Sequence, residues 1–213
     1  MKNDLTELVF ILDKSGSMSG LEKDTIGGFN SLIEKQKKEE GRAIVSTVLF
    51  NHEVEVIHDR VSLEDITLLT DKEYCVSGCT ALLDAMGETI SNVLTKQNKS
   101  KEDKPSKTMF IITTDGMENS SKEYTYKAIK KMIEKVKKEN EWEFIFLGAN
   151  IDAVSEASKF GIDKENAVNY KCDEKGVALN YECLSTAITG IRKNKTISKS
   201  WRKSIDKDLE ERG

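Results

Sequence analysis

The sequence predicts a doubly wound α/β fold: a six-stranded, mostly parallel sheet with one antiparallel edge strand and helices on both faces. Short β-rich runs alternate with segments of helical period along the chain, which is typical of a parallel sheet covered by helices. Two of these runs are apolar on both faces, as central strands require. Two other runs are separated by only two residues, which predicts a hairpin and therefore an antiparallel pair.

The N-terminal half contains three predicted strands and the start of a second helix. Leu5–Leu12 is a central strand because its second half is apolar without interruption. A helix follows from near Leu21 to Glu39, where apolar residues recur at a spacing of three and four. Ala43–Phe50 and Glu53–Ile57 form the hairpin, and after a less regular stretch the second helix begins near Thr80.

The C-terminal half continues the alternation. A polar loop, Asn98–Ser106, leads into a second central strand at Lys107–Thr114. A lysine-rich helix is predicted from near Lys122 to Asn140, because its apolar residues lie on one stripe. The remaining elements are predicted as strand, helix, strand and helix, at Trp142–Gly148, Val154–Phe160, Ala167–Tyr170 and Val177–Ile191.

The apolar period fades near residue 194, which divides the chain into a predicted domain over residues 1–193 and a charged C-terminal segment, residues 194–213. The segment contains six basic and four acidic residues together with Trp201. We expect it to form a last helix that docks on the domain and buries Trp201.

The composition of the chain argues against several classes of function. The 213 residues include 33 basic and 37 acidic side chains, a net charge of −4, which argues against a nucleic-acid binder with a basic face. The first apolar run, Leu8–Leu12, is too short for a signal core or a membrane span, so we expect a cytoplasmic protein without a membrane partner. The four cysteines lack C-x-x-C spacing and are expected to be free thiols. Both histidines, His52 and His58, are expected to be exposed.

Three polar segments follow, or begin beside, the carboxyl ends of predicted strands, the edge where open parallel sheets bind ligands. They are Asp13-Lys14-Ser15-Gly16-Ser17, Gly78-Cys79-Thr80 and Thr113-Thr114-Asp115-Gly116. Together they supply carboxylates and hydroxyls, the hard oxygen ligands that suit Mg²⁺ or Mn²⁺. The candidate metal-site residues are therefore Asp13, Ser15, Ser17, Thr80 and Asp115.

This set of motifs, Asp-x-Ser-x-Ser, a distant Gly-x-Thr and Thr-Asp-Gly, resembles the metal-ion-dependent adhesion site (MIDAS) of von Willebrand factor A domains. The resemblance spans roughly Leu5 to Ile191. It implies that the two serines bind the metal directly, that Thr80 does so in one conformation, and that Asp13 and Asp115 act largely through water. It also implies that a Glu or Asp carboxylate of a partner protein completes the coordination.

Simpler structural roles are open for the same residues. The serines could cap the first helix, Thr80 could cap the second, and Asn119 is more typical of a turn or cap than of a ligand. Asp84 lies one turn into the second helix and could face the same cluster, at most as an outer acceptor.

The sequence favours a binding module over an enzyme. A metal-dependent, phosphatase-like hydrolase would use Asp13 as nucleophile, but the second acid expected two residues later is replaced by Ser15. Neither histidine lies in the predicted site to act as a base, and no phosphate-binding glycine loop is present. The other alternative is an assembly protein whose metal site is vestigial.

Overall fold

A six-stranded sheet runs through the centre of the computed structural model, which describes residues 4–99, 104–193 and 196–212. The strand order is β3-β2-β1-β4-β5-β6, and only the β2–β3 pair is antiparallel. The predicted fold class is therefore confirmed. The strands are β1 (Thr6–Asp13), β2 (Ala43–Phe50), β3 (Val54–Ser62), β4 (Lys107–Thr114), β5 (Glu143–Ala149) and β6 (Ala167–Tyr170).

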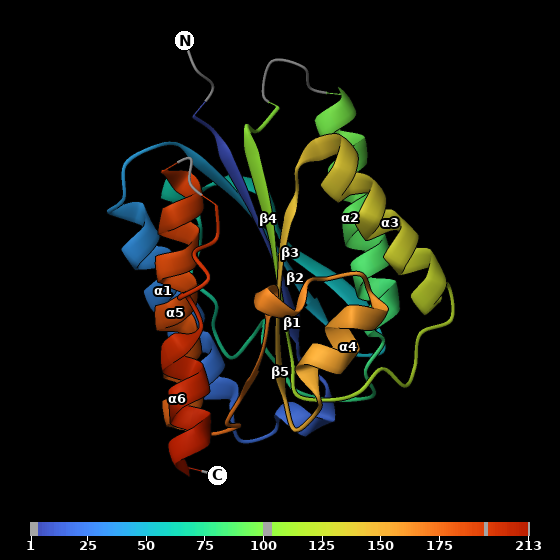
Figure 1. Ribbon diagram of the computed structural model, residues 1–213, viewed down its shortest axis with the longest axis vertical. Coiled ribbons are helices and arrows are strands. Elements are labelled where there is room, and N and C mark those ends of the chain that lie inside the picture. The colour runs from blue at the N-terminus through green and yellow to red at the C-terminus, as the bar shows by residue number, and fades with distance from the viewer. Residues whose placement is uncertain (1–3, 100–103, 194–195, 213) are drawn as a thin grey trace.

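Helices cover both faces of the sheet (Figure 1). One layer holds α1 (Glu22–Lys37), α5 (Glu174–Arg192) and α6 (Lys203–Arg212), and the other holds α2 (Leu82–Lys99), α3 (Tyr126–Asn140) and α4 (Ala153–Lys159). Short 3₁₀ turns lie at η1 (Gly16–Met18), η2 (Leu63–Asp65) and η3 (Lys164–Asn166). In the described part of the chain, no helix combines the length and the apolar character that crossing a membrane requires.

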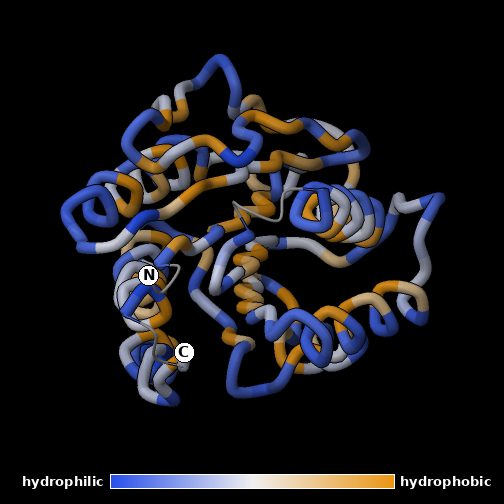
Figure 2. The backbone as a smooth tube through the Cα atoms, turned by 90° about the horizontal axis from the view of Figure 1, so that it is seen from above, coloured by the Kyte–Doolittle hydropathy of each residue, from blue (hydrophilic) through white to orange (hydrophobic). Residues whose placement is uncertain are grey.

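The two helical layers explain why the central strands are apolar without interruption. Successive residues of a strand point to opposite faces, so Phe10 packs in the cluster beneath α1 and α5, whereas Val9 packs in the cluster beneath α2 and α3. In Figure 2, where the backbone is coloured by residue hydropathy, hydrophobic residues lie mostly toward the centre of the molecule and hydrophilic residues occupy the outer loops. The parallel pairing of β1 with β4 places the carboxyl ends of the two strands side by side.

The edge strand β3 differs from the sequence-based prediction. It extends to Ser62 rather than ending near Ile57, and its register with β2 shifts on either side of Thr47, the residue opposite His58. The predicted exposure of His58 is wrong: the side chain is 4% exposed, and its Nε2 lies 3.0 Å from the Thr67 hydroxyl. The polar run from residue 58 to 60 lacks the apolar pattern of a strand, and the burial of His58 involves a contact with Thr67 that its own neighbours in sequence do not indicate.

A buried ion pair lies near the beginning of β1, far from its carboxyl end. Glu7 is fully buried; Arg60 Nε lies 3.1 Å from one of its carboxylate oxygens, and Gln97 Nε2 lies 2.9 Å from the other. Burial raises the pKa of Glu7, and the Arg60 charge opposes that rise. The pair connects β1 to the irregular edge strand β3, while Gln97 connects it to α2.

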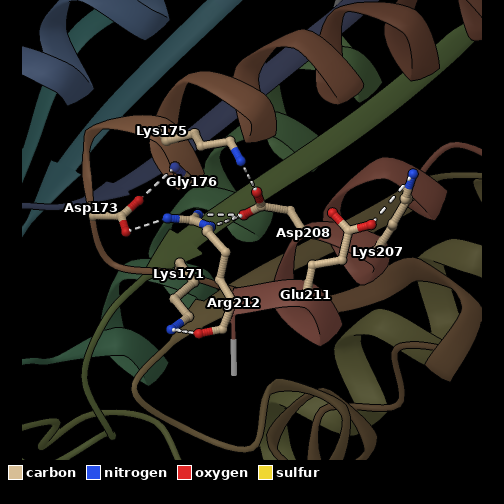
Figure 3. Close-up of polar contacts among 8 residues, drawn as sticks. All are labelled: Lys171, Asp173, Lys175, Gly176, Lys207, Asp208, Glu211 and Arg212. Carbon is tan, nitrogen blue, oxygen red and sulfur yellow. Dashed lines mark hydrogen bonds and ion pairs between the residues drawn. The ribbon is translucent and has the colours of Figure 1, made fainter.

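The C-terminal segment forms α6, which contacts α5 and β6. Trp201 is 4% exposed, and its indole N–H donates to the carbonyl of Glu165 at 3.0 Å. Beyond it, Arg212 bonds to both Asp208 and Asp173 (Figure 3), and so fastens the end of α6 to the residue that caps α5. The division of the chain at residue 193 stays a prediction.

Candidate metal centre

Three loops meet at the carboxyl edge of β1 and β4, the edge near which α6 ends in Figure 1. The first follows β1 through η1, the second connects η2 to α2, and the third follows β4. Backbone bonds join the first two loops, since the amide of Gly16 donates to the carbonyl of Gly78 at 3.0 Å and that of Ser77 donates to Lys14 at 2.9 Å. The folded chain thus brings the three predicted segments together.

Asp13 stands at the base of the cluster and is 1% exposed. One carboxylate oxygen accepts from the Ser15 amide at 2.7 Å, and the other accepts from the Thr114 hydroxyl at 2.6 Å. Burial raises the pKa of Asp13 to about 6, against the lowering effect of these bonds. The carboxylate is therefore fixed in orientation by groups from β1's own turn and from β4.

The two serines and Asp115 form a continuous chain of oxygens. Ser15 Oγ lies 3.1 Å from Ser17 Oγ, and Ser17 Oγ donates to Asp115 Oδ1 at 2.5 Å. Ser15 is buried, whereas Ser17 is exposed. The cluster consequently opens to solvent on the Ser17 side, where an incoming ligand has access.

Thr80 completes the cluster from the second loop. A Cβ built on Gly116 would lie 3.3 Å from both the Thr80 hydroxyl and the Ser17 hydroxyl, so the two hydroxyls flank the same glycine. The Thr80 amide donates to Asn119 at 2.9 Å, and the Asn119 amide donates to the Thr80 carbonyl at 3.0 Å. This reciprocal pair holds the second loop against the third.

Asp115 carries an unsatisfied oxygen. The residue is 3% exposed, and its Oδ2 has no hydrogen-bond partner among the described residues. Burial raises the pKa of Asp115, and the Ser17 hydroxyl opposes the rise. A buried carboxylate oxygen without a donor is costly, and a bound cation or its water would satisfy it.

The donor set fits a hard divalent cation. Hydroxyl and carboxylate oxygens surround the space between the loops, as Mg²⁺ and Mn²⁺ prefer. No group of three or more His, Cys, Asp or Glu side chains that could hold a metal occurs within residues 4–99, 104–193 and 196–212; the cluster contains two carboxylates, and its other side-chain oxygens are hydroxyls. Asp13, Ser15, Ser17, Thr80 and Asp115 would hold the ion, which would offer a positive centre to an anionic ligand.

The simpler roles considered for the serines and threonine are not observed. The N-cap of α1 is Leu21, with no side-chain cap bond. At the beginning of α2, the amide of Leu83 donates to the Glu118 carboxylate, and the amide of Asp84 donates to the Ser121 hydroxyl. The hydroxyls of the cluster are thus not used as caps of these helices.

Two acidic side chains near the cluster hold loops in place. Asp84 accepts backbone N–H bonds from residues 122, 123 and 124, so it orders the loop before α3. Glu118 joins the third loop to α2 and also accepts from the amides of Ser120 and Ser121. Sequence reasoning missed Glu118 and the Thr114 bond to Asp13, because the partners lie far apart in the chain.

The four cysteines are free thiols. Cys75 and Cys79 are exposed, Cys172 is half-buried and Cys183 is buried. Burial raises the pKa of Cys172, and the Asp115 carboxylate adds to the rise.

The protein is an open-sheet α/β protein, and loops at the carboxyl edge of its sheet carry clustered hydroxyls and carboxylates. A family model described as the von Willebrand factor type A domain matches residues 7–176. The chain belongs to the von Willebrand factor type A domain family. A comparison of the sequence with curated proteins gives no match.

Solved structures share the fold at low sequence identity. Proximal thread matrix protein 1 from the mussel byssus has a TM-score of 0.62 at 13% identity, over 87% of this chain and 46% of its own. A von Willebrand factor type A protein from Catenulispora acidiphila has a TM-score of 0.61 at 16% identity, over 87% and 43%. This chain spans less than half the length of both.

A third structure matches over nearly its whole length. The vWF domain of the type V pili tip protein Mfa5 from Porphyromonas gingivalis has a TM-score of 0.59 at 12% identity, over 86% of this chain and 94% of its own. At such identities the likeness shows the fold alone.

Proposed function

We propose that this chain is a metal-dependent protein-binding module and not an enzyme. Mg²⁺ or Mn²⁺ binds at Asp13, Ser15, Ser17, Thr80 and Asp115, and the bound metal captures an acidic side chain of a partner protein. The observation that carries the proposal is the buried, unsatisfied Oδ2 of Asp115 within a cluster of hydroxyls.

The character of the ligands favours an anionic partner. Three of the five groups are neutral hydroxyls, and the resemblance to the metal-ion-dependent adhesion site implies that the two carboxylates act largely through water, so an anion bound directly to the ion is favoured. A bound cation is often the largest local charge in such a site. Exposed Ser17 leaves that charge reachable, and Met117, 59% exposed on the third loop, offers apolar contact beside it. A carboxylate on a protein surface matches both features.

The likeness to pilus and byssus proteins supports a binding role by analogy of fold. A cytoplasmic location is part of the proposal, supported by the free state of all four cysteines.

A titration with Mn²⁺, followed by the electron paramagnetic resonance signal of the free ion, tests the metal site. Ser17→Ala removes one proposed ligand and the donor to Asp115, and we expect its affinity to fall at least tenfold. Ser19→Ala is the matched control, because Ser19 is exposed and lies outside the cluster. Equal affinities for the two variants would count against the site.

Carboxylate capture is tested separately, with immobilised peptides that differ only in Glu against Gln. We expect retention of the Glu peptides in Mg²⁺, loss of retention in EDTA, and no retention of the Gln peptides. Equal retention of the Glu peptides in Mg²⁺ and in EDTA would refute the proposed mode of binding.

A further inference from the structure

The backbone of Asp13 lies where β1 leaves the sheet. Its pairing with β4 ends one residue earlier, at Leu12 opposite Thr113, while β2 still pairs at Phe50. Because Asp13 is 1% exposed, its carbonyl is shielded from water, and a buried carbonyl left without a donor is costly. The carbonyl therefore requires a donor from elsewhere in the fold.

Tyr74 supplies that donor. Its hydroxyl donates to the Asp13 carbonyl, and the ring is 1% exposed in the core beneath α1. The Thr25 side chain of α1 contacts the same hydroxyl. Together with the bonds from Ser15 and Thr114 to the carboxylate, this bond means that all three oxygens of Asp13 are held.

The loop that carries Tyr74 also carries Thr80. The Tyr74 amide is bound to the carbonyl of Thr70 at 3.1 Å, and three residues later the Ser77 amide donates to Lys14. The loop between η2 and α2 thus binds the Asp13 carbonyl through Tyr74 and also carries Thr80. A shift of Tyr74 would move two of the proposed metal-site residues relative to each other.

We propose that Tyr74 is a positioning residue of the metal centre, which fixes the Asp13 backbone through its hydroxyl without touching the ion. The inference rests on the proposed function. Partners that orient metal ligands commonly contribute about 10–100-fold to metal affinity, so loss of this one hydroxyl should be measurable in metal binding.

The chain offers a matched control in Tyr181. It is 6% exposed and belongs to the same core cluster as Tyr74, but its buried hydroxyl has no hydrogen-bond partner among the described residues. Tyr181→Phe and Tyr74→Phe remove the same atom from the same core. Only Tyr74→Phe leaves the Asp13 carbonyl without its donor.

The experiment measures Mn²⁺ dissociation constants and metal-free melting temperatures for the full chain and both variants. We expect affinity to fall about tenfold or more in Tyr74→Phe and to change less than twofold in Tyr181→Phe. An unchanged affinity in Tyr74→Phe, even with a lower melting temperature, would show a merely structural role. Equal losses in both variants would also overturn the proposal.

The wild-type titration separates this inference from the proposed function. If the wild type does not bind Mn²⁺, the metal-site proposal fails and the role of Tyr74 fails with it. If the wild type binds and Tyr74→Phe binds equally well, only the role of Tyr74 fails. Should Tyr74→Phe not fold in buffer alone, the three proteins are titrated in sucrose, which favours the compact state, and an unchanged affinity of Tyr74→Phe there would overturn the inference.

Discussion

Gly116→Ala places one methyl group between two proposed ligands without changing any of them. The new Cβ would lie 3.3 Å from Ser17 Oγ and from Thr80 Oγ1, so both hydroxyls have to give way by a few tenths of an ångström. Metal–ligand distances tolerate about 0.2 Å. We therefore expect metal affinity to fall about 10–100-fold, equivalent to roughly 1.4–2.7 kcal/mol.

The assay is an Mn²⁺ titration beside urea unfolding of the metal-free protein. Gly27→Ala is the control, because no atom lies within 4 Å of its built Cβ in α1, and alanine there should add about 0.5–1 kcal/mol of stability. The reasoning is refuted if Gly116→Ala binds Mn²⁺ as tightly as the wild type. The prediction also fails if the lower apparent affinity of Gly116→Ala is fully explained by a smaller folded fraction of that variant.

Three further predictions concern the scaffold. Trp201→Ala should cost about 3–5 kcal/mol in urea unfolding, and a loss below about 1 kcal/mol would show that the C-terminal segment is dispensable. Hydrogen bonds from Arg212 lower the pKa of Asp173 and of Asp208 in the folded protein. The two carboxylates therefore stabilise the fold above their unfolded pKa of about 4. This stabilisation is lost as pH falls through the lower folded pKa values. The melting temperature should consequently depend less on pH between about 5 and 2 in Arg212→Ala, and an unchanged pH dependence would contradict this assignment. Arg60→Met should cost about 3 kcal/mol in urea unfolding, because it leaves buried Glu7 without its cation; a double variant with Glu7→Met should recover most of the loss, and no recovery would argue against the pair.

The sequence was informative wherever local pattern decides structure. Strand residues such as Val9 and Phe10 alternate between two buried faces, so their unbroken apolar run predicted a central strand. The five candidate residues were brought together because each lies in a loop at, or leading to, the carboxyl edge of the sheet. Their role as metal ligands is still a prediction.

Long-range contacts set the limit of the sequence-based reading. Tyr74 bonds to a residue 61 positions away, and nothing local in its sequence marks it as a partner of Asp13. His58 was predicted to be exposed, yet it is buried and contacts the Thr67 hydroxyl, nine residues away. Asp84 was considered for the cluster, but three backbone amides of a distant loop claim its carboxylate. Such roles depend on tertiary packing, which residue spacing alone does not encode.

We propose that the cluster around Asp13 and Asp115 binds a divalent cation. The most direct test is a thermal melt of EDTA-treated protein with and without Mg²⁺, run beside Asp13→Ala. Ligand at about 100 times its dissociation constant should stabilise the wild type by roughly 2.7 kcal/mol, a shift of about 5–10 °C for a chain of this length, and the variant should not shift. An equal shift in Asp13→Ala, or none in the wild type, would show that the cluster does not bind Mg²⁺ in the proposed way.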